Sequence, residues 1–182
     1  MKVNPKLYVH QGPEWLIPYC GGISTFYNKY KQKYKKLKII PYLCGMNCNT
    51  KVSDCSHEEL SHVIGLTYDW CVETMGYKKK RGFPDLKVSK KKYKENSYYA
   101  HYIRDTHRIT IFPSSFSHHN HTLRKLISIV IHEYRHTLQK GGDEKYIKLS
   151  EKYGYWNNPL EVDARSYEKN WNICYKQIKD KL

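Results

Sequence analysis

The chain has 182 residues, 40% of them hydrophobic, which is enough to bury one core of ordinary size. Lys and Arg outnumber Asp and Glu by 32 to 17, and the net charge of +15 favours acidic partners such as nucleic acid or acidic protein surfaces. We find no basic N-terminal segment followed by an apolar run, and no stretch as long and apolar as a bilayer requires. We therefore expect a soluble, unexported, cytoplasmic protein without a membrane partner, either free or packaged in a virion.

The six cysteines are expected to be thiols, because the cytosol keeps cysteines reduced. Cys44, Cys48, Cys55 and His57 resemble a structural zinc set, with Cys20 as a further ligand. Their spacing is irregular and includes no C-x-x-C pair, which favours the alternative of ordinary buried or loop thiols.

Residues 1–55 are predicted to form an N-terminal arm, a basic helix and a cysteine-bearing loop. Prolines interrupt the short apolar pieces that precede Cys20, so this part is expected to lie as an arm over the domain. Aromatic residues recur at helical spacing among lysines between Ser24 and Leu37, which predicts a basic amphipathic helix.

Residues 56–182 are predicted to complete one compact α+β domain. Ser56 and Glu59 form a capping pair for a helix over His57–Met75, which Gly76 ends. Residues 77–94 are dominated by Lys and Arg, and we expect a loop there with at most a short strand around Leu86 to Ser89.

Two β-rich runs, Tyr98–Ile103 and Arg108–Phe112, are joined by a short polar link and predict a hairpin. Its second strand is expected to form the rim of a cleft and to pair with an extended substrate through main-chain hydrogen bonds. Apolar residues then trace a long amphipathic helix from Leu123 to Leu138. A final helix is predicted to begin at Asn158-Pro159 and to run toward Lys179.

The motif His132-Glu133-Tyr134-Arg135-His136 lies on the long amphipathic helix and carries the chemistry. Side chains four apart share one face of a helix, so His132 and His136 can bind one cation through their imidazole nitrogens. In this HExxH arrangement Glu133 takes a proton from metal-bound water and hands it to the leaving amine, while zinc polarises the scissile carbonyl. The alternative is a surface helix with two solvated histidines, which the strong amphipathic pattern disfavours.

Two histidines leave a tetrahedral zinc one protein ligand short, and the downstream candidates are Glu161, Asp163 and Glu168. Asp163 lies about 200° around the helix from Glu161 and should not reach the metal. Glu168 shares the face of Glu161 but lies about 10 Å further along the axis, so only one of the two should meet the histidines. We favour Glu161, whose helix entry Pro159 fixes, over the alternative that Glu161 only caps its helix with Asn158.

These two segments, Leu126–Gln139 and Asn158–Arg165, resemble the small gluzincin-like metallopeptidases. The Glu-x-x-Ala spacing is similar to that of the peptidases that cleave phage repressors, and the likeness extends over about Ser56–Lys179. It implies a zincin-like fold in which a helix, a small sheet with a hairpin, the HExxH helix and a C-terminal helix carrying Glu form the catalytic core. The implied zinc ligands are His132, His136 and Glu161, with Glu133 as the base.

The sequence departs from the larger gluzincins at one position. Those proteins often carry an Asp four residues after the Glu ligand, where it orients a histidine, and here that position is Arg165. Asp163 is a weak substitute for it.

Further candidates are the tyrosines of the connection between the two motifs. Tyr153 and Tyr155 could supply a hydroxyl that stabilises the transition state, or a wall of the cleft. Packing in the core or at the rim is the alternative for both.

The lysine-rich stretches interleave with tyrosines, a pattern that suits phosphate contact with occasional base stacking. Lys78, Lys79, Lys80 and Arg81 are the candidate nucleic-acid-binding residues, and a solvated surface is an equally good interpretation.

The predicted function is zinc-dependent hydrolysis of peptide bonds in a protein or peptide, including one bound to nucleic acid. One alternative is a nucleic-acid-associated binding protein of a viral particle or mobile element, with a vestigial or structural zinc site. Another is a metal-dependent hydrolase of a different bond, such as an amide in a cell-wall peptide.

Overall fold

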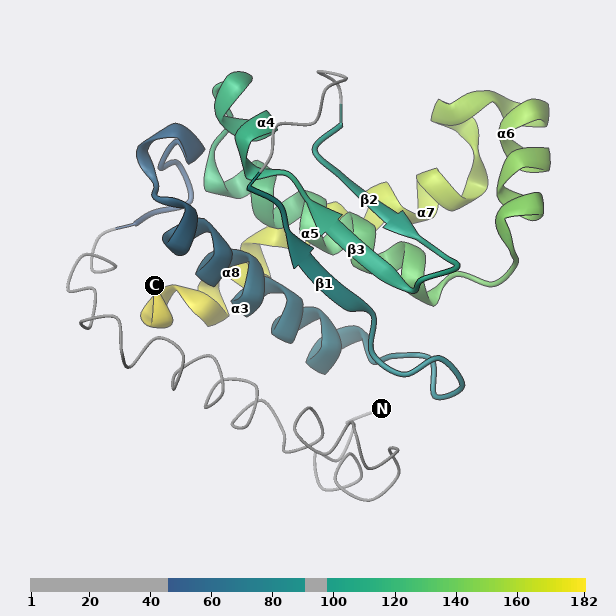
Figure 1. Cartoon of the computed structure of the whole chain (residues 1–182), viewed down its shortest axis with the longest axis horizontal. Helices are drawn as coiled ribbons and strands as arrows, with labels where there is room; N and C mark the ends of the chain where they lie inside the picture. The colour runs from purple at the N-terminus through teal and green to yellow at the C-terminus, as the bar shows by residue number, and fades with distance from the viewer. Residues whose placement is uncertain (1–45, 91–97) are drawn as a thin grey trace. The chain divides into compact units, whose positions relative to one another are not determined.

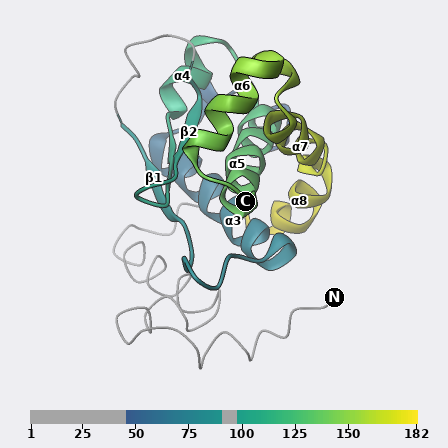
Figure 2. The ribbon, with the colours of Figure 1, turned by 90° about the vertical axis from the view of Figure 1, so that its right-hand side faces the viewer.

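The computed structural model describes residues 46–90 and 98–182, which belong to one compact unit, Gly45–Leu182. The predicted arm, the predicted basic helix at Ser24–Leu37, Cys20 and Cys44 lie outside the described residues. The described part is α+β, as expected, and consists of a small sheet with helices packed on one face (Figures 1 and 2). Within it, no helix has the length and apolarity needed to cross a membrane.

The helices and strands follow one another in this order: η4 (Val52–Asp54), α3 (His57–Met75), β1 (Asp85–Val88), β2 (Ala100–Ile103), β3 (Arg108–Ile111), α4 (Pro113–His118), α5 (Leu123–Leu138), α6 (Asp143–Asn157), α7 (Pro159–Glu168), α8 (Trp171–Ile178) and η5 (Lys179–Lys181).

The sheet has the strand order β1-β3-β2, and its two pairings differ in direction. β2 pairs with β3 antiparallel, with Tyr102 opposite Ile109, so the predicted hairpin is present. β1 pairs with β3 parallel, with Leu86 also opposite Ile109. The expectation that the second hairpin strand forms the cleft rim is therefore wrong, because β3 is central and both its edges are occupied. The strand with the most buried residues, including Ile109 and Ile111, takes the central place, and β2 is left at an edge.

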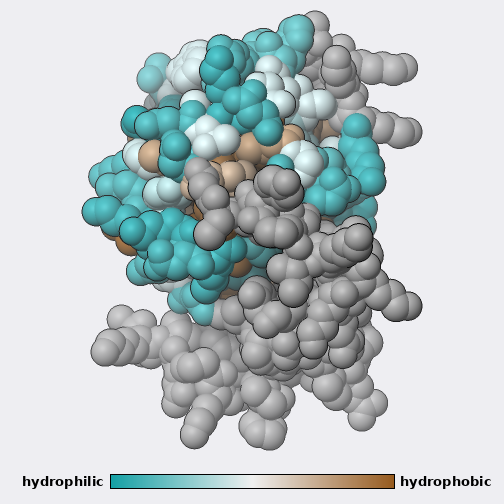
Figure 3. Space-filling view, turned by 90° about the vertical axis from the view of Figure 1, so that its left-hand side faces the viewer, coloured by the Kyte–Doolittle hydropathy of each residue, from teal (hydrophilic) through white to brown (hydrophobic). Residues whose placement is uncertain are grey.

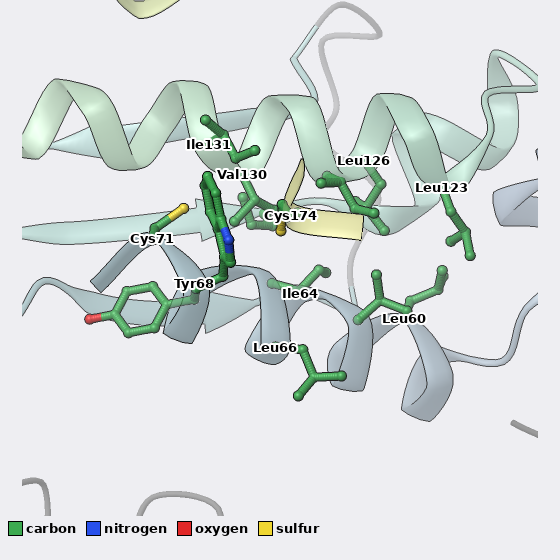
Figure 4. Packing of buried hydrophobic residues seen from close by; sticks show 14 of the residues in the cluster. Leu60, Ile64, Leu66, Tyr68, Cys71, Leu123, Leu126, Val130, Ile131 and Cys174 are labelled. Carbon is green, nitrogen blue, oxygen red and sulfur yellow. The ribbon is translucent and has the colours of Figure 1, made fainter. Parts of the chain in front are cut away.

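Helix α3 begins and ends where its capping residues predict. The Ser56 hydroxyl accepts a hydrogen bond from the Glu59 N–H, and the Glu59 carboxylate accepts one from the Ser56 N–H. Gly76 ends the helix with a φ of +73°, in the left-handed region that favours glycine. Between these caps, Leu60, Ile64 and neighbouring apolar residues pack against α5 (Figure 4).

Helix α5 is the centre of the fold, because both of its faces are buried. One face packs into the core through six apolar side chains, and Figure 4 shows four of them: Leu123, Leu126, Val130 and Ile131. The other face carries His132, Glu133 and His136 and meets α7. The residues that stabilise the domain and the residues of the candidate site therefore share one rigid element.

Two helices in the structure were not predicted, and one prediction merged two helices. α4 follows β3 directly, with Pro113 in its first turn, where the missing N–H of proline costs nothing. α6 fills the connection in which no element was expected, and none of its residues, all of which the structure describes, is buried. The final helix is interrupted at Lys169 and Asn170, which separate α7 from α8.

The segment before α3 is attached to the start of α5. The Val52 N–H donates to the His121 carbonyl, and the Leu123 N–H donates to the Thr50 carbonyl.

On the face shown in Figure 3, hydrophilic side chains dominate the described surface and apolar ones gather near its middle.

Candidate metal centre

His132, His136 and Glu161 come together where α5 crosses the first turn of α7. One ligand atom from each side chain lies within 4.8 Å of the other two, and among the described residues this is the group that could hold a metal ion. The three residues are 6%, 9% and 2% exposed, respectively. The structure therefore unites the three predicted ligands in a buried place.

The distances within this cluster suit tetrahedral coordination. The two Nε2 atoms are 3.0 Å apart, and the Glu161 oxygens lie 3.3 Å from Nε2 of His132 and 3.4 Å from Nε2 of His136. Zinc–nitrogen bonds of 2.0–2.1 Å in a tetrahedron separate neighbouring ligand atoms by about 3.3 Å. The cluster can therefore accept a zinc-sized ion with little rearrangement.

One carboxylate oxygen of Glu161 is left without a hydrogen bond. Tyr146 donates to Oε1 at 2.7 Å, whereas the buried Oε2 has no hydrogen-bond partner within the described part of the chain. A buried acceptor without a partner is costly, and a cation at this place would satisfy it. The donor set of two imidazoles and a carboxylate matches the ligands of catalytic zinc sites.

Each histidine is held at its outer ring nitrogen by an oxygen. Nδ1 of His132 lies 2.9 Å from Oε1 of Glu168, and Nδ1 of His136 lies 2.8 Å from Oε1 of Gln139. These oxygens accept, so in a neutral imidazole the proton lies on Nδ1 and the lone pair of Nε2 faces the cluster. The expectation that only one of Glu161 and Glu168 can meet the histidines is wrong, because the two carboxylates contact opposite nitrogens of His132.

The charges of these groups make the cluster attractive to cations. Burial opposes the charged form of His132, but its close contacts with the Glu161 and Glu168 carboxylates outweigh it and raise the pKa of His132 to about 9. Burial likewise opposes ionisation of Glu161, but its contacts with His132, His136 and Tyr146 lower its pKa to about 2. Burial and the nearby charge of His132 lower the pKa of His136. Without a metal the centre thus pairs the Glu161 anion with a protonated His132 beside a neutral His136, and a bound cation would take the place of the His132 proton.

Glu133 lies beside the cluster, against strand β2. It is 9% exposed, and its carboxylate accepts a hydrogen bond from the backbone of Tyr102. Burial is the main cause that raises the pKa of Glu133 to about 7, and the charge of His132 opposes this rise. A carboxyl group that titrates near neutrality can both take up and release a proton.

Asp163 lies outside the cluster, and Arg165 lies at its margin, with Nη1 4.0 Å from Oε2 of Glu161. Asp163 accepts two hydrogen bonds from Arg135, at 2.8 Å and 3.0 Å, and one from Gln139 at 2.9 Å. Arg165 donates to the Trp156 carbonyl, and its guanidinium lies over the Trp156 ring. Neither side chain orients a histidine directly.

Helix α6 brings two tyrosines to Glu161, one of which was predicted. Burial, the charge of Glu161 and a hydrogen bond to that carboxylate raise the pKa of Tyr155 to about 12. Tyr146 makes the closer contact described above, and it was missed because no helix was expected there. Tyr153 is 43% exposed, and the Lys152 ammonium lies 5.0 Å from its ring centroid. The Tyr153 ring thus contacts a surface lysine.

Two of the four candidate nucleic-acid-binding residues are hydrogen-bonded within the protein. Lys78 donates to the Gln139 carbonyl, and Arg81 donates to the Arg104 carbonyl at 3.0 Å. Lys79 and Lys80 are exposed.

The described cysteines of the possible second zinc set do not form a metal-binding group with His57. Cys55 Sγ instead lies 3.7 Å from the sulfur of Met46 and 3.5 Å from the Lys51 carbonyl. Burial is the main cause that raises the pKa of the Cys55 thiol to about 11, which keeps it protonated.

Comparison with known proteins identified no relative of this chain. Neither a protein-family model, nor a curated protein, nor a solved structure matches the chain.

Proposed function

We propose that the chain is a zinc-dependent peptidase of the gluzincin-like type, with a zincin-like catalytic unit that hydrolyses peptide bonds in a protein or peptide. The observation that carries this proposal is the buried Oε2 of Glu161, which has no hydrogen-bond partner in the described part and lies 3.3 Å from Nε2 of His132. His132, His136 and Glu161 would hold the zinc ion. When bound, zinc polarises the scissile carbonyl and lowers the pKa of a water molecule.

Glu133 is suited to be the proton carrier of this reaction. Its carboxylate is buried beside His132 and kept in place by the backbone hydrogen bond from Tyr102. As a general base it accepts a proton from the attacking water, and as a general acid it then gives this proton to the leaving amine. The pKa of about 7 supports both steps near neutral pH.

The edge strand β2 supports a binding place for an extended peptide. Phe112 N–H donates to the Tyr99 carbonyl, and hydrogen-bonded pairs alternate along an antiparallel ladder. The main-chain groups of Ala100 and the carbonyl of Tyr102 therefore point away from β3, toward the edge that no described strand occupies, while the Tyr102 N–H is taken by Glu133. A peptide added along this edge would run past Glu133, since Tyr102 contacts its carboxylate.

The tyrosines of α6 support transition-state stabilisation from the opposite side. Tyr155 is 53% exposed and its hydroxyl lies next to Glu161, so a substrate carbonyl held at the metal would come close to it. A phenol that remains protonated up to a pKa of about 12 is a hydrogen-bond donor at every physiological pH.

The substitution Glu133→Gln tests the proposal. Gln is nearly isosteric and can still accept from Tyr102, but it cannot take up a proton from water. We expect near-normal zinc content and a loss of peptide cleavage of about 10²–10⁴-fold, measured on a peptide that a library screen with the zinc-loaded wild-type chain selects. Glu151→Gln, on the exposed surface of α6, is the matched control and should cleave normally. Retained turnover in Glu133→Gln refutes the assignment of the base.

The main rival is a nucleic-acid-associated protein with a purely structural metal site. The net charge of +15 favours it, and zinc binding without cleavage of any library peptide would support it. Including cell-wall peptides in the library separates peptidase activity from hydrolysis of another amide.

A further inference from the structure

We propose that Glu168 is the positioning residue for His132, and that its carboxylate sets the affinity of the centre for zinc. The inference rests on the proposed zinc site and not on peptide hydrolysis. Its basis is the contact of 2.9 Å between Oε1 of Glu168 and Nδ1 of His132, on the ring edge opposite to Glu161.

The geometry of the His132 ring explains what this contact does. A carboxylate on Nδ1 fixes the proton on that nitrogen and stops the ring from turning about its side-chain bonds. Nε2, the other nitrogen, is then presented to Glu161 and His136 as an electron-pair donor. The negative charge of Glu168 also makes the imidazole a stronger base, and hence a stronger metal ligand.

The placement of Glu168 on its helix argues against a purely stabilising role. It is the last residue of α7, and the C-terminal end of a helix carries a partial negative charge that repels a carboxylate. Its side chain is only 21% exposed, so it also loses much of its hydration. Lys125 lies 3.5 Å from Oε2 and compensates in part. The contact with His132 offsets the rest of these costs.

The two histidines are held by different chemistry. Glu168 presents a carboxylate to His132, whereas Gln139 presents a neutral amide to His136. The larger gluzincins often carry a histidine-orienting Asp four residues after the Glu ligand, and in this chain that position is Arg165. In this chain the acid that touches a histidine stands seven residues after Glu161, at the end of α7 and just before the break that leads into α8.

Zinc affinity, measured on the full chain by competition with a chromophoric chelator, tests this role. We expect Glu168→Ala to bind zinc about 10–100-fold more weakly than the wild type. Glu168→Gln keeps an oxygen acceptor but loses the charge, so its affinity should fall between these two. The exposed Glu151→Gln, which loses the same charge on α6, should bind zinc like the wild type. Because Gln preserves the shape of the side chain, this variant keeps the test decisive even if the Ala variant fails to fold.

A nitrogen NMR spectrum of the zinc-loaded chain supplies a second readout. We expect the proton of His132 on Nδ1 and zinc on Nε2 in the wild type and in Glu168→Gln. The proposal is overturned if the Glu168 variants bind zinc within twofold of the wild type, if Glu151→Gln weakens binding equally, or if zinc is found on Nδ1 of His132. None of these measurements needs a peptide, so absent cleavage would count against the proposed activity alone.

Discussion

Replacing Gln139 with Leu should reveal how the candidate site is joined to the fold. Gln139 follows the last residue of α5, is 5% exposed and makes three side-chain hydrogen bonds. Its amide donates to the Leu160 carbonyl at 2.6 Å and to Asp163 at 2.9 Å, and its oxygen accepts from His136 at 2.8 Å. Leu fills a similar volume and removes all three bonds.

The expected loss follows from these contacts. A typical net contribution is about 1 kcal/mol for a neutral hydrogen bond and about 1.5–3 kcal/mol for one to a charged group such as Asp163. Three bonds therefore suggest a loss of about 3–5 kcal/mol in the free energy of unfolding. The loss approaches the upper end if the Leu160 carbonyl stays buried without a partner.

Urea unfolding of the metal-free chain, followed by circular dichroism, measures this loss. Gln139→Glu is the informative companion, because Glu can accept from His136 but cannot donate to Leu160 and is repelled by Asp163. It should be at least as unstable as Gln139→Leu at pH 7 and should recover part of its stability at low pH, where the carboxyl becomes neutral. A loss below about 1 kcal/mol in Gln139→Leu would refute this account of how α5 and α7 are held together.

Three further predictions concern pH, substrate and charge. Burial, followed by the charge of Glu73, raises the pKa of Asp69 to about 7, so the folded protein favours the protonated carboxyl. The contribution of Asp69 to the free energy of unfolding is therefore full below about pH 4, the ordinary pKa of the carboxyl, and is lost as the pH rises through 7. Asp69→Asn should remove this loss and raise the free energy of unfolding at pH 8 by at most about 4 kcal/mol, measured by urea titrations at pH 4 and 8. Trp156 is 72% exposed, and its ring contacts Tyr155 and Arg165. Trp156→Ala should therefore lower stability by less than about 1 kcal/mol. If the proposed peptidase binds substrate beside Tyr155, this variant should raise the KM for an apolar peptide, and an unchanged KM would count against a substrate contact at Trp156. Reversing the charges of the exposed Lys79 and Lys80 should weaken binding to a DNA duplex and flatten its salt dependence, and no binding of the wild type at low salt would leave only a solvated surface.

Local signals in the sequence predicted the elements that carry the site. The capping pair Ser56 and Glu59 determined the start of α3, and the periodic apolar residues of α5 determined both its length and the face on which His132 lies. α6 escaped prediction because its residues remain at least partly exposed, so it lacks an apolar stripe that a periodic pattern could reveal. The central place of β3 also escaped, because its parallel pairing with β1 is a non-local contact.

The partners of the histidines could not have been found by spacing alone. Glu168 lies too far along its helix to meet the same nitrogen of His132 as Glu161, but the imidazole ring has a second nitrogen, and Glu168 contacts that one. Gln139 carried no signal, since its role depends on where α7 packs against the end of α5. The contacts of Glu168 and Gln139 both depend on how α5 crosses α7. The sequence motifs predict that these two helices meet at the ligands, but they do not predict which other side chains touch.

That crossing is held by direct contacts and not by the segment that connects the two helices. Arg135 of α5 and Gln139, which directly follows α5, both donate to Asp163 of α7, and the fully buried Ala164 leaves room for the helices to approach closely. α6 lies between them in sequence and packs against α7, where the Asn158 amide donates to the Tyr146 carbonyl and to the Ser150 hydroxyl. It reaches the centre through tyrosine hydroxyls on Glu161. The positions of the three candidate ligands are therefore set mainly by α5 and α7, and the Tyr146 hydroxyl of α6 adds one hydrogen bond to Glu161.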